Sequence, residues 1–185
     1  HRFIASTLPG RSHGTRDILH GAFTSAEDTI DIFVNHWTSK YGGAYETEEL
    51  RLYQAKLLSA VIDTLLEYNS GHKVIICGDF NDNSHSASIK QLSSQGLIEE
   101  IQPQNGRCTY KYQGRWDLID HVFIAGSWSK NSCITEVFEA PYLLEEDGKY
   151  TGRKPFRTYL GFTYNGGVSD HLPILLHFNP EADSG

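Results

Sequence analysis

Two short segments of this 185-residue chain place polar, chemically active groups next to apolar runs. The first, Gly-Asp-Phe-Asn-Asp, contains Asp79 and Asn81, and the second, Ser-Asp-His-Leu-Pro, contains Asp170 and His171. Carboxylate and amide oxygens bind hard cations, and an imidazole exchanges protons near neutral pH. Together these residue types are typical of a site that hydrolyses phosphate esters with the help of a divalent metal.

Strands and helices must position these groups. Apolar runs and β-branched residues predict strands over residues 29–36, 72–79, 108–112, 116–124, 133–138 and 172–178. A long helix is predicted to begin after Thr47 as its N-cap and to end at Asn69, and a shorter one covers residues 86–94. Strand-helix-strand followed by antiparallel pairs predicts an α/β protein with a mixed sheet.

The candidate residues stand at strand ends. Open α/β sheets bind ligands beyond the carboxyl ends of their strands. His36 and Asp79 each end a predicted strand, and Asp170 and His171 lie in the loop that enters the last one. We therefore expect these side chains to meet at one rim of the sheet.

Composition indicates a globular domain, or a large part of one, with 39% hydrophobic and 21% charged residues. No apolar run approaches the ~20 residues of a membrane helix. The net charge of −7 gives no basic footprint for nucleic acid. Bound metal ions supply positive charge locally, so a polynucleotide substrate is disfavoured rather than excluded. The sequence indicates no compartment.

Four motifs, taken in order, resemble the endonuclease/exonuclease/phosphatase superfamily of deoxyribonuclease-like phosphoesterases. They are Asn35-His36-Trp37, Gly78-Asp79-Phe80-Asn81, Ile119-Asp120-His121 and Ser169-Asp170-His171-Leu172-Pro173. The resemblance implies Mg²⁺- or Mn²⁺-dependent hydrolysis of a phosphate ester by in-line attack of water. It also implies a four-layered α/β sandwich, in which two packed mixed sheets are flanked by helices.

The resemblance also implies roles for the polar residues of these motifs. Asp170 and Asp79 would bind the metal, and Asp79 would also orient or deprotonate the attacking water. His171 would contact the phosphate and transfer a proton, with Asp120 holding its imidazole. Asn81 would bind phosphate or metal-bound water.

Three further residues have two explanations each. His36 would bind phosphate or assist protonation of the leaving group; alone, it would more often be structural. Arg16 is a candidate phosphate contact, although pairing with a structural acid is favoured. Tyr164, in a polar, aromatic loop predicted over residues 141–168, either stacks on a base, sugar or lipid head group or packs the loop. His121 is expected to be structural, because strand alternation turns it away from Asp120.

The chain departs from the family pattern at its start. An early Asn and a metal-ligating Glu on an N-terminal strand are not found, and Glu27 falls too late in the sequence. We therefore interpret residues 1–185 as one domain fragment, the C-terminal part of the family domain. Such a fragment supplies about one sheet, whose apolar inner face would need the missing N-terminal part, another copy or another chain to cover it. Weak or absent turnover is expected of it.

The favoured function is therefore a metal-dependent phosphoesterase. Its substrate would be a phosphorylated small molecule, a lipid head group or nucleic acid, with the first two favoured by the acidic charge. The competing class is a non-catalytic fragment or binding module that retains the fold. A zinc hydrolase is disfavoured, because the histidines show no His-x-x-x-His spacing.

Overall fold

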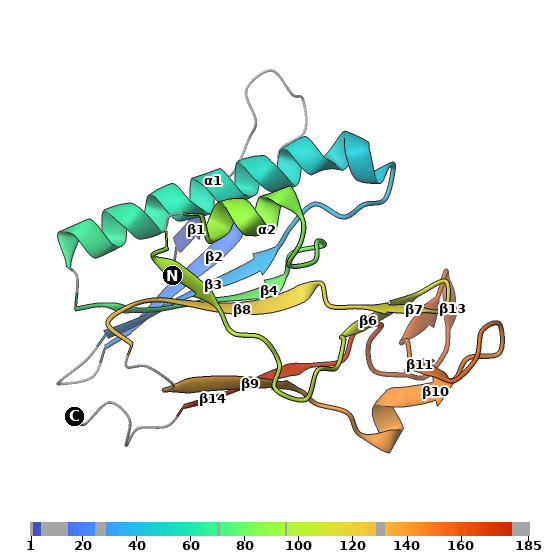
Figure 1. The fold of residues 1–185 in the computed structure, drawn as a ribbon. Coiled ribbons are helices and arrows are strands. Elements are labelled where there is room, and N and C mark those ends of the chain that lie inside the picture. The colour runs from blue at the N-terminus through green and yellow to red at the C-terminus, as the bar shows by residue number, and fades with distance from the viewer. Residues whose placement is uncertain are drawn as a thin grey trace.

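The computed structural model describes residues 15–24, 29–69, 71–94, 96–128 and 132–178, together with the backbone of residues 2–4. Within these residues, a six-stranded sheet has the order β1-β2-β3-β4-β8-β5 (Figure 1). Its strands are β1 (Arg2–Ile4), β2 (Ile18–Thr24), β3 (Thr29–His36), β4 (Lys73–Asp79), β8 (Asp120–Gly126) and β5 (Ile98–Glu100). β3 and β4 run parallel and the other neighbours are antiparallel. The predicted α/β fold with a mixed sheet is confirmed.

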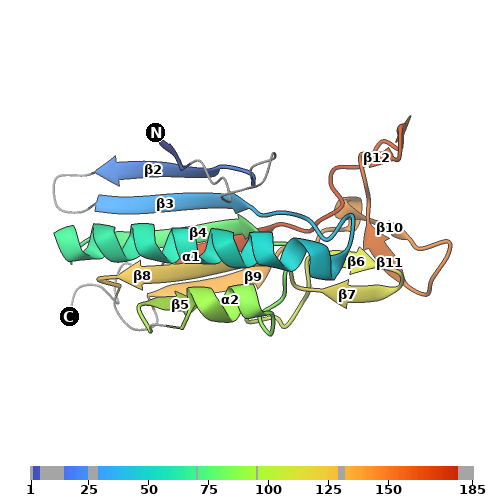
Figure 2. The ribbon, with the colours of Figure 1, turned by 90° about the horizontal axis from the view of Figure 1, so that it is seen from above.

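Helices α1 (Ala44–Tyr68) and α2 (Ala87–Leu92) cover one face of this sheet (Figures 1 and 2). Leu58 and Ile62, one turn apart on α1, are fully buried and pack in one cluster with Phe33, Ile76 and Phe123 of the sheet. The main core therefore lies between the helices and the sheet. Burial of each such side chain stabilises the folded state by about 1.5–3 kcal/mol. No described helix is long and apolar enough to cross a membrane.

The long helix begins one turn earlier than predicted. Its N-cap is Gly43, and the Thr47 hydroxyl donates to the Gly43 carbonyl at 2.8 Å instead of capping the helix. Gly42 and Gly43 have φ angles of 92° and 121°, which favour glycine and turn the chain into the helix early. The end before Asn69 agrees with the prediction.

A smaller sheet covers part of the opposite face. It pairs β9 (Cys133–Val137) with β14 (Ile174–Phe178) and lies below the main sheet in Figure 1. Helices, main sheet and small sheet thus form successive layers of the sandwich.

The face of the main sheet turned away from the helices, called here the inner face, is only partly covered. Val34 of β3 pairs with Leu19 of β2 and Cys77 of β4, so these side chains share that face. Val122 of β8 is 5% exposed, whereas Leu19 and Val34 are 37% and 44% exposed. Phe23 on β2 is 57% exposed. The apolar patch expected from the sequence therefore lies on β2 and β3.

The region after residue 108 differs from the prediction in detail. Gln113 and Gly114 do turn a hairpin, but it consists of β6 (Tyr110–Tyr112) and β7 (Arg115–Asp117). β8 is a separate strand that starts at Asp120, after Leu118 and Ile119. There the Phe80 N–H donates to the Ile119 carbonyl at 2.9 Å and joins the chain to the main sheet.

Residues 141–168 are not the irregular loop that the sequence predicted. They contain η1 (Pro141–Leu143), β10 (Leu144–Glu146), β11 (Arg153–Pro155), β12 (Tyr159–Leu160) and β13 (Thr163–Tyr164). A buried Lys111–Asp147 ion pair at 2.9 Å holds the β10–β11 hairpin against the body. Strands of two or three residues leave no alternation to read in the sequence. Glu27 lies outside the described residues.

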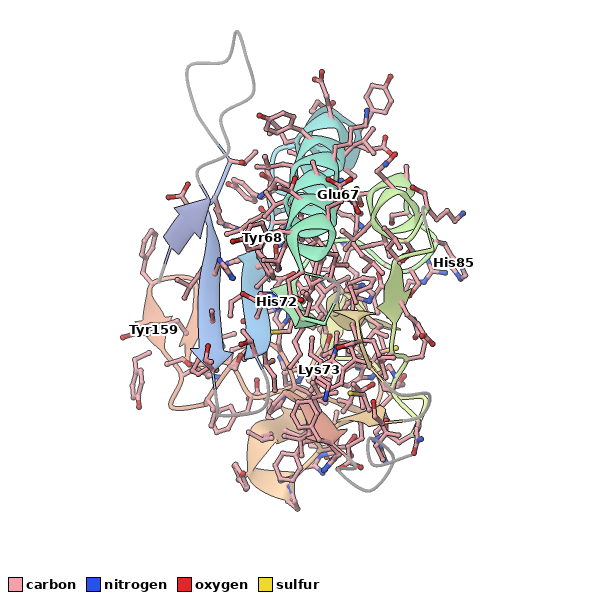
Figure 3. All side chains as sticks on the ribbon, turned by 90° about the vertical axis from the view of Figure 1, so that its left-hand side faces the viewer. Glu67, Tyr68, His72, Lys73, His85 and Tyr159 are labelled. Atoms are coloured by element: carbon pink, nitrogen blue, oxygen red, sulfur yellow. The ribbon has the colours of Figure 1, made fainter. Side chains whose placement is uncertain are left out.

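We expect the exposed inner face to bind an apolar dye. Replacing Phe23 and Val34 with serine should reduce fluorescence of 8-anilinonaphthalene-1-sulfonate and any self-association, because both side chains expose apolar surface there. Tyr68→Ser is the control, because Tyr68 is 91% exposed at the far end of α1 (Figure 3). A monodisperse wild-type monomer without dye binding would contradict the interpretation.

Candidate active site

Strand register brings three of the expected residues into one row. His36 pairs with Asp79 across β3 and β4, and Asp79 pairs with Asp120 across β4 and β8. Paired residues share a face, so all three lie on the inner face, at the end where β3 and β4 finish (Figure 2). His36 and Asp79 therefore meet at one rim of the sheet, with Asp120 beside them.

Asp79 occupies the centre of this row. Its Oδ1 accepts the backbone N–H of Asn81 at 2.8 Å, and its Oδ2 lies 3.6 Å from Nε2 of His36. Burial raises the pKa of the Asp79 carboxyl, and the negative charge of Asp120 raises it further. A carboxylate with a raised pKa is a stronger base than an exposed one, which suits proton removal from water.

Asn81 and Arg16 meet at a backbone carbonyl beside His36. Asn81 Nδ2 and Arg16 Nη1 both donate to the Trp37 carbonyl, at 3.1 and 2.6 Å. Asn81 has a φ of 53°, in the left-handed region that asparagine tolerates better than most residues. Burial lowers the pKa of His36, and the nearby Arg16 charge lowers it further. Arg16 therefore lies at the edge of the row.

His171 is held against Asp120. Its Nδ1 lies 2.7 Å from Asp120 Oδ2, and the Thr109 hydroxyl donates to the same oxygen. Burial of the His171 ring lowers its pKa, but the hydrogen bond with Asp120 and the charges of Asp120, Asp79 and Asp170 outweigh this, so the pKa is raised. The arrangement thus favours a charged imidazole.

Asp170 is exposed beside His171. The Ser169 hydroxyl accepts the backbone N–H of His171 at 3.1 Å, which shapes the turn that carries both residues. In the described part of the chain, no three His, Cys, Asp or Glu side chains are arranged to hold a metal ion. Metal binding by Asp79 and Asp170 therefore stays a prediction.

Tyr164 is not brought against this row. It lies on the β12–β13 hairpin, which projects from the body (Figure 2), and is 68% exposed. Its ring makes an edge contact with Tyr159 at 5.6 Å between centroids. A stacking role for Tyr164 stays a prediction.

His121 is in a structural position, as expected. It is buried on the helix-covered face, with Nδ1 2.6 Å from Glu100 and Nε2 2.8 Å from the Asp82 carbonyl. Asp82 is itself buried, and Arg51 donates to it at 2.6 Å. Ser88 and Lys40 also bind the Asp82 carboxylate, so the turn after Asp79 is held from the helix side.

Sequence reasoning missed Thr109 and Tyr110. Besides binding Asp120, Thr109 accepts the backbone N–H of Leu172 through its carbonyl, at 2.8 Å. Tyr110 forms a β-bridge with His171 and packs its ring 4.7 Å from the imidazole. No local pattern in the sequence links residues 109–110 with His171, more than 50 positions away, so only the fold could reveal the contact.

Comparison with known proteins identifies the family. The model of the Endonuclease/Exonuclease/phosphatase family matches residues 5–180. The chain belongs to this family. No curated protein matches the sequence.

Solved structures share the family fold at low sequence identity. A Staphylococcus aureus beta toxin mutant with bound magnesium ions is 18% identical, with a TM-score of 0.61, and 86% of this chain covers 57% of it. Sphingomyelinase C from Streptomyces griseocarneus is 16% identical, with a TM-score of 0.61, and 88% of this chain covers 57% of it. The human Nocturnin catalytic domain with bound sulfate is 17% identical, with a TM-score of 0.57 and coverages of 95% and 56%. The chain thus spans slightly more than half of each structure.

We expect Asp120→Asn to lower the pKa of His171, because the variant removes the negative charge that favours the imidazolium. An NMR titration of the imidazole measures this, with Asp117→Asn on the neighbouring hairpin as the control. The interactions that raise the pKa of His171 also stabilise the folded state. This stabilisation is fully present at pH values below 6.5, the ordinary pKa of the imidazole. That stabilisation is lost as pH rises through the folded-state pKa, so the variant should lose stability mainly at the acid end. An unchanged pKa would contradict this assignment.

Proposed function

We propose that this chain carries the water-handling acid and the phosphate-binding histidine of a divalent-metal-dependent phosphoesterase. One observation supports this most strongly: strand pairing aligns His36, Asp79 and Asp120, while Asp120 holds the imidazole of His171. A purely structural cluster would not need Asp79 and His36 to remain partly open to solvent, at 20% and 58% side-chain exposure. Family membership favours catalysis over a binding module.

The two histidines suit different tasks. The pKa of His36 is lowered by burial and Arg16, whereas that of His171 is raised by Asp120 and its neighbours. Near neutral pH, His171 is therefore the better partner for a phosphate oxygen, and a neutral His36 is the better hydrogen-bonding group for water or the leaving oxygen. Separation of two pKa values within one site is how acid and base roles are divided.

Asp79 is the proposed base. Its raised pKa suits it to take a proton from water, and its partly exposed Oδ2, 3.6 Å from His36 Nε2, can orient that water molecule. The backbone N–H of Asn81 fixes the other carboxylate oxygen, so the carboxylate is oriented before substrate binds.

The described residues fit a magnesium or manganese ion. Magnesium keeps several water ligands and needs only one or two carboxylates with the substrate phosphate, which Asp79 and Asp170 can provide. When bound, the metal would neutralise charge on the phosphate and acidify water. The beta toxin relative carries magnesium, which is consistent with this choice.

The substrate class is supported less directly than the reaction. A lipid head group or a small phosphorylated molecule is favoured over long nucleic acid, since the net charge of −7 repels a polyanion. Sphingomyelinase C among the structural neighbours is consistent with a lipid head group.

We also propose that further polypeptide completes the site. The exposed apolar patch on β2 and β3 lies on the same face as His36 and Asp79, and the neighbours are nearly twice as long as the matched region. Further residues of the family domain, or another chain, would cover the patch and add a metal-binding carboxylate.

Substituting Asp79 or Asp170 with asparagine in the full-length protein tests the catalytic proposal. Each change should reduce Mg²⁺- or Mn²⁺-dependent hydrolysis of bis-p-nitrophenyl phosphate by about a hundredfold or more, because it removes a base or a metal ligand. The control is Asp63→Asn on α1, which covers the opposite face of the sheet. This variant should leave turnover nearly unchanged. Unchanged turnover in both active-site variants would refute the proposal.

The isolated 185-residue chain provides a separate test. Its metal-dependent turnover should be weak or absent, because it supplies only part of the proposed metal site. Isothermal titration calorimetry with Mg²⁺ alone should likewise show weaker binding than in the full-length protein. Robust turnover by the isolated chain would show that no completing polypeptide is needed.

A further inference from the structure

Arg157 is held next to the Ser169-Asp170-His171 segment by main-chain hydrogen bonds. The carbonyl of the preceding Phe156 accepts the N–H groups of Val168 and Ser169, at 2.8 and 3.2 Å. Asn165 Nδ2 donates to the Arg157 carbonyl at 3.1 Å. These bonds use main-chain atoms of the 156–157 segment, so the position of Arg157 relative to Asp170 and His171 does not depend on its side chain.

Close packing at Gly167 strengthens this connection. A Cβ at this glycine would lie 2.1 Å from the Phe156 carbonyl oxygen and 2.6 Å from that of Arg157. The two segments therefore approach more closely than any other residue would allow. Thr158 adds a hydrogen bond from its hydroxyl to the Val168 carbonyl, at 2.6 Å.

The side chains of Arg157 and His171 both lie against the ring of Tyr110. The guanidinium carbon of Arg157 lies 5.8 Å from the centroid of Tyr110, and the His171 ring lies 4.7 Å from the same centroid. Arg157 is half-buried, and it forms no ion pair within the described part of the chain. A guanidinium and an imidazole thus lie against one ring.

The contacts of the described residues give no structural reason for placing the Arg157 guanidinium here. A guanidinium over an aromatic ring keeps the N–H donors at its edges available, and their planar fork matches the oxygens of a phosphate. The nearby acids Asp79, Asp120 and Asp170 would repel an anion, so an unpaired arginine here compensates for their charge.

We propose that Arg157 binds a second phosphate group of the substrate, beside the phosphate that His171 contacts. The substrate class is then a diphosphate or a bisphosphorylated compound. This assignment rests on the proposed function, because His171 is taken as the contact for the phosphate that reacts. Arg157 is a specificity-determining residue in this scheme, and Tyr110 positions both side chains.

Calorimetric titration of the full-length protein with inorganic pyrophosphate and with inorganic phosphate, in metal-chelated buffer, tests the proposal. Wild type should bind pyrophosphate more tightly than phosphate. Arg157→Ala should weaken pyrophosphate binding about tenfold, the value of one charge-assisted hydrogen-bonding group, and change phosphate binding by less than about twofold. Arg115→Ala removes the same charge from an exposed position on β7 and should affect neither anion.

Three outcomes would overturn the assignment. If Arg157→Ala weakens binding of pyrophosphate and phosphate equally, Arg157 contacts the same phosphate as His171. If it weakens binding of neither anion, Arg157 is not part of the site. If the wild-type protein does not prefer pyrophosphate to phosphate, the proposed substrate class is refuted. If Arg157→Ala unfolds in a thermal melt, Arg157→Lys takes its place; it keeps the charge, loses the fork and should weaken pyrophosphate about threefold. These titrations measure binding without metal and without turnover. If the hydrolysis assays contradict the proposed function, the binding result for Arg157 can still be interpreted by itself.

Discussion

The site depends on the close approach of β3 and β4 at Gly78. A Cβ at this position would lie 2.0 Å from the carbonyl oxygen of Asn35, and Gly78 has a φ of 131°, so another residue would force the strands apart. Asn35 pairs with Gly78 and the next pair is His36 with Asp79. The absence of one side chain therefore sets how closely imidazole and carboxylate meet, and β8 continues the same register to Asp120.

Burial and charge then divide the work between similar groups. His36 and His171 flank the same acids, yet the pKa of one is lowered and that of the other raised. The difference arises because Asp120 binds His171 directly, whereas His36 faces Arg16 and stands 3.6 Å from Asp79. Asp82 is buried on the helix side of the site, where its bond with Arg51 holds the turn after Asp79 in place. It is not among the charges that most shift the pKa of either histidine.

Strand ends were the part of the site that sequence could predict. His36 and Asp79 follow apolar runs long enough to be read as strands, and the contact of Asp120 with His171 was inferred from the family motifs. Thr109, Tyr110 and Arg157 could not be predicted, because strands of two or three residues have no readable period and their contacts join distant segments. The N-cap at Thr47 was wrong for a local reason, since two glycines with positive φ start the helix earlier.

The inner face links the incomplete core to the chemistry. Val34, exposed on β3, lies two residues before His36 and on the same side of the strand. Cys77 likewise lies two residues before Asp79, and Val122 lies two residues after Asp120 on the antiparallel strand β8. Any polypeptide that covers the apolar patch must therefore end beside the polar row. Burying that patch would also desolvate the carboxylates, which raises the pKa of Asp79 further unless a cation arrives with it. In the proposed scheme, completion of the core and assembly of the metal site would be coupled, because the same face carries the apolar patch and the polar row.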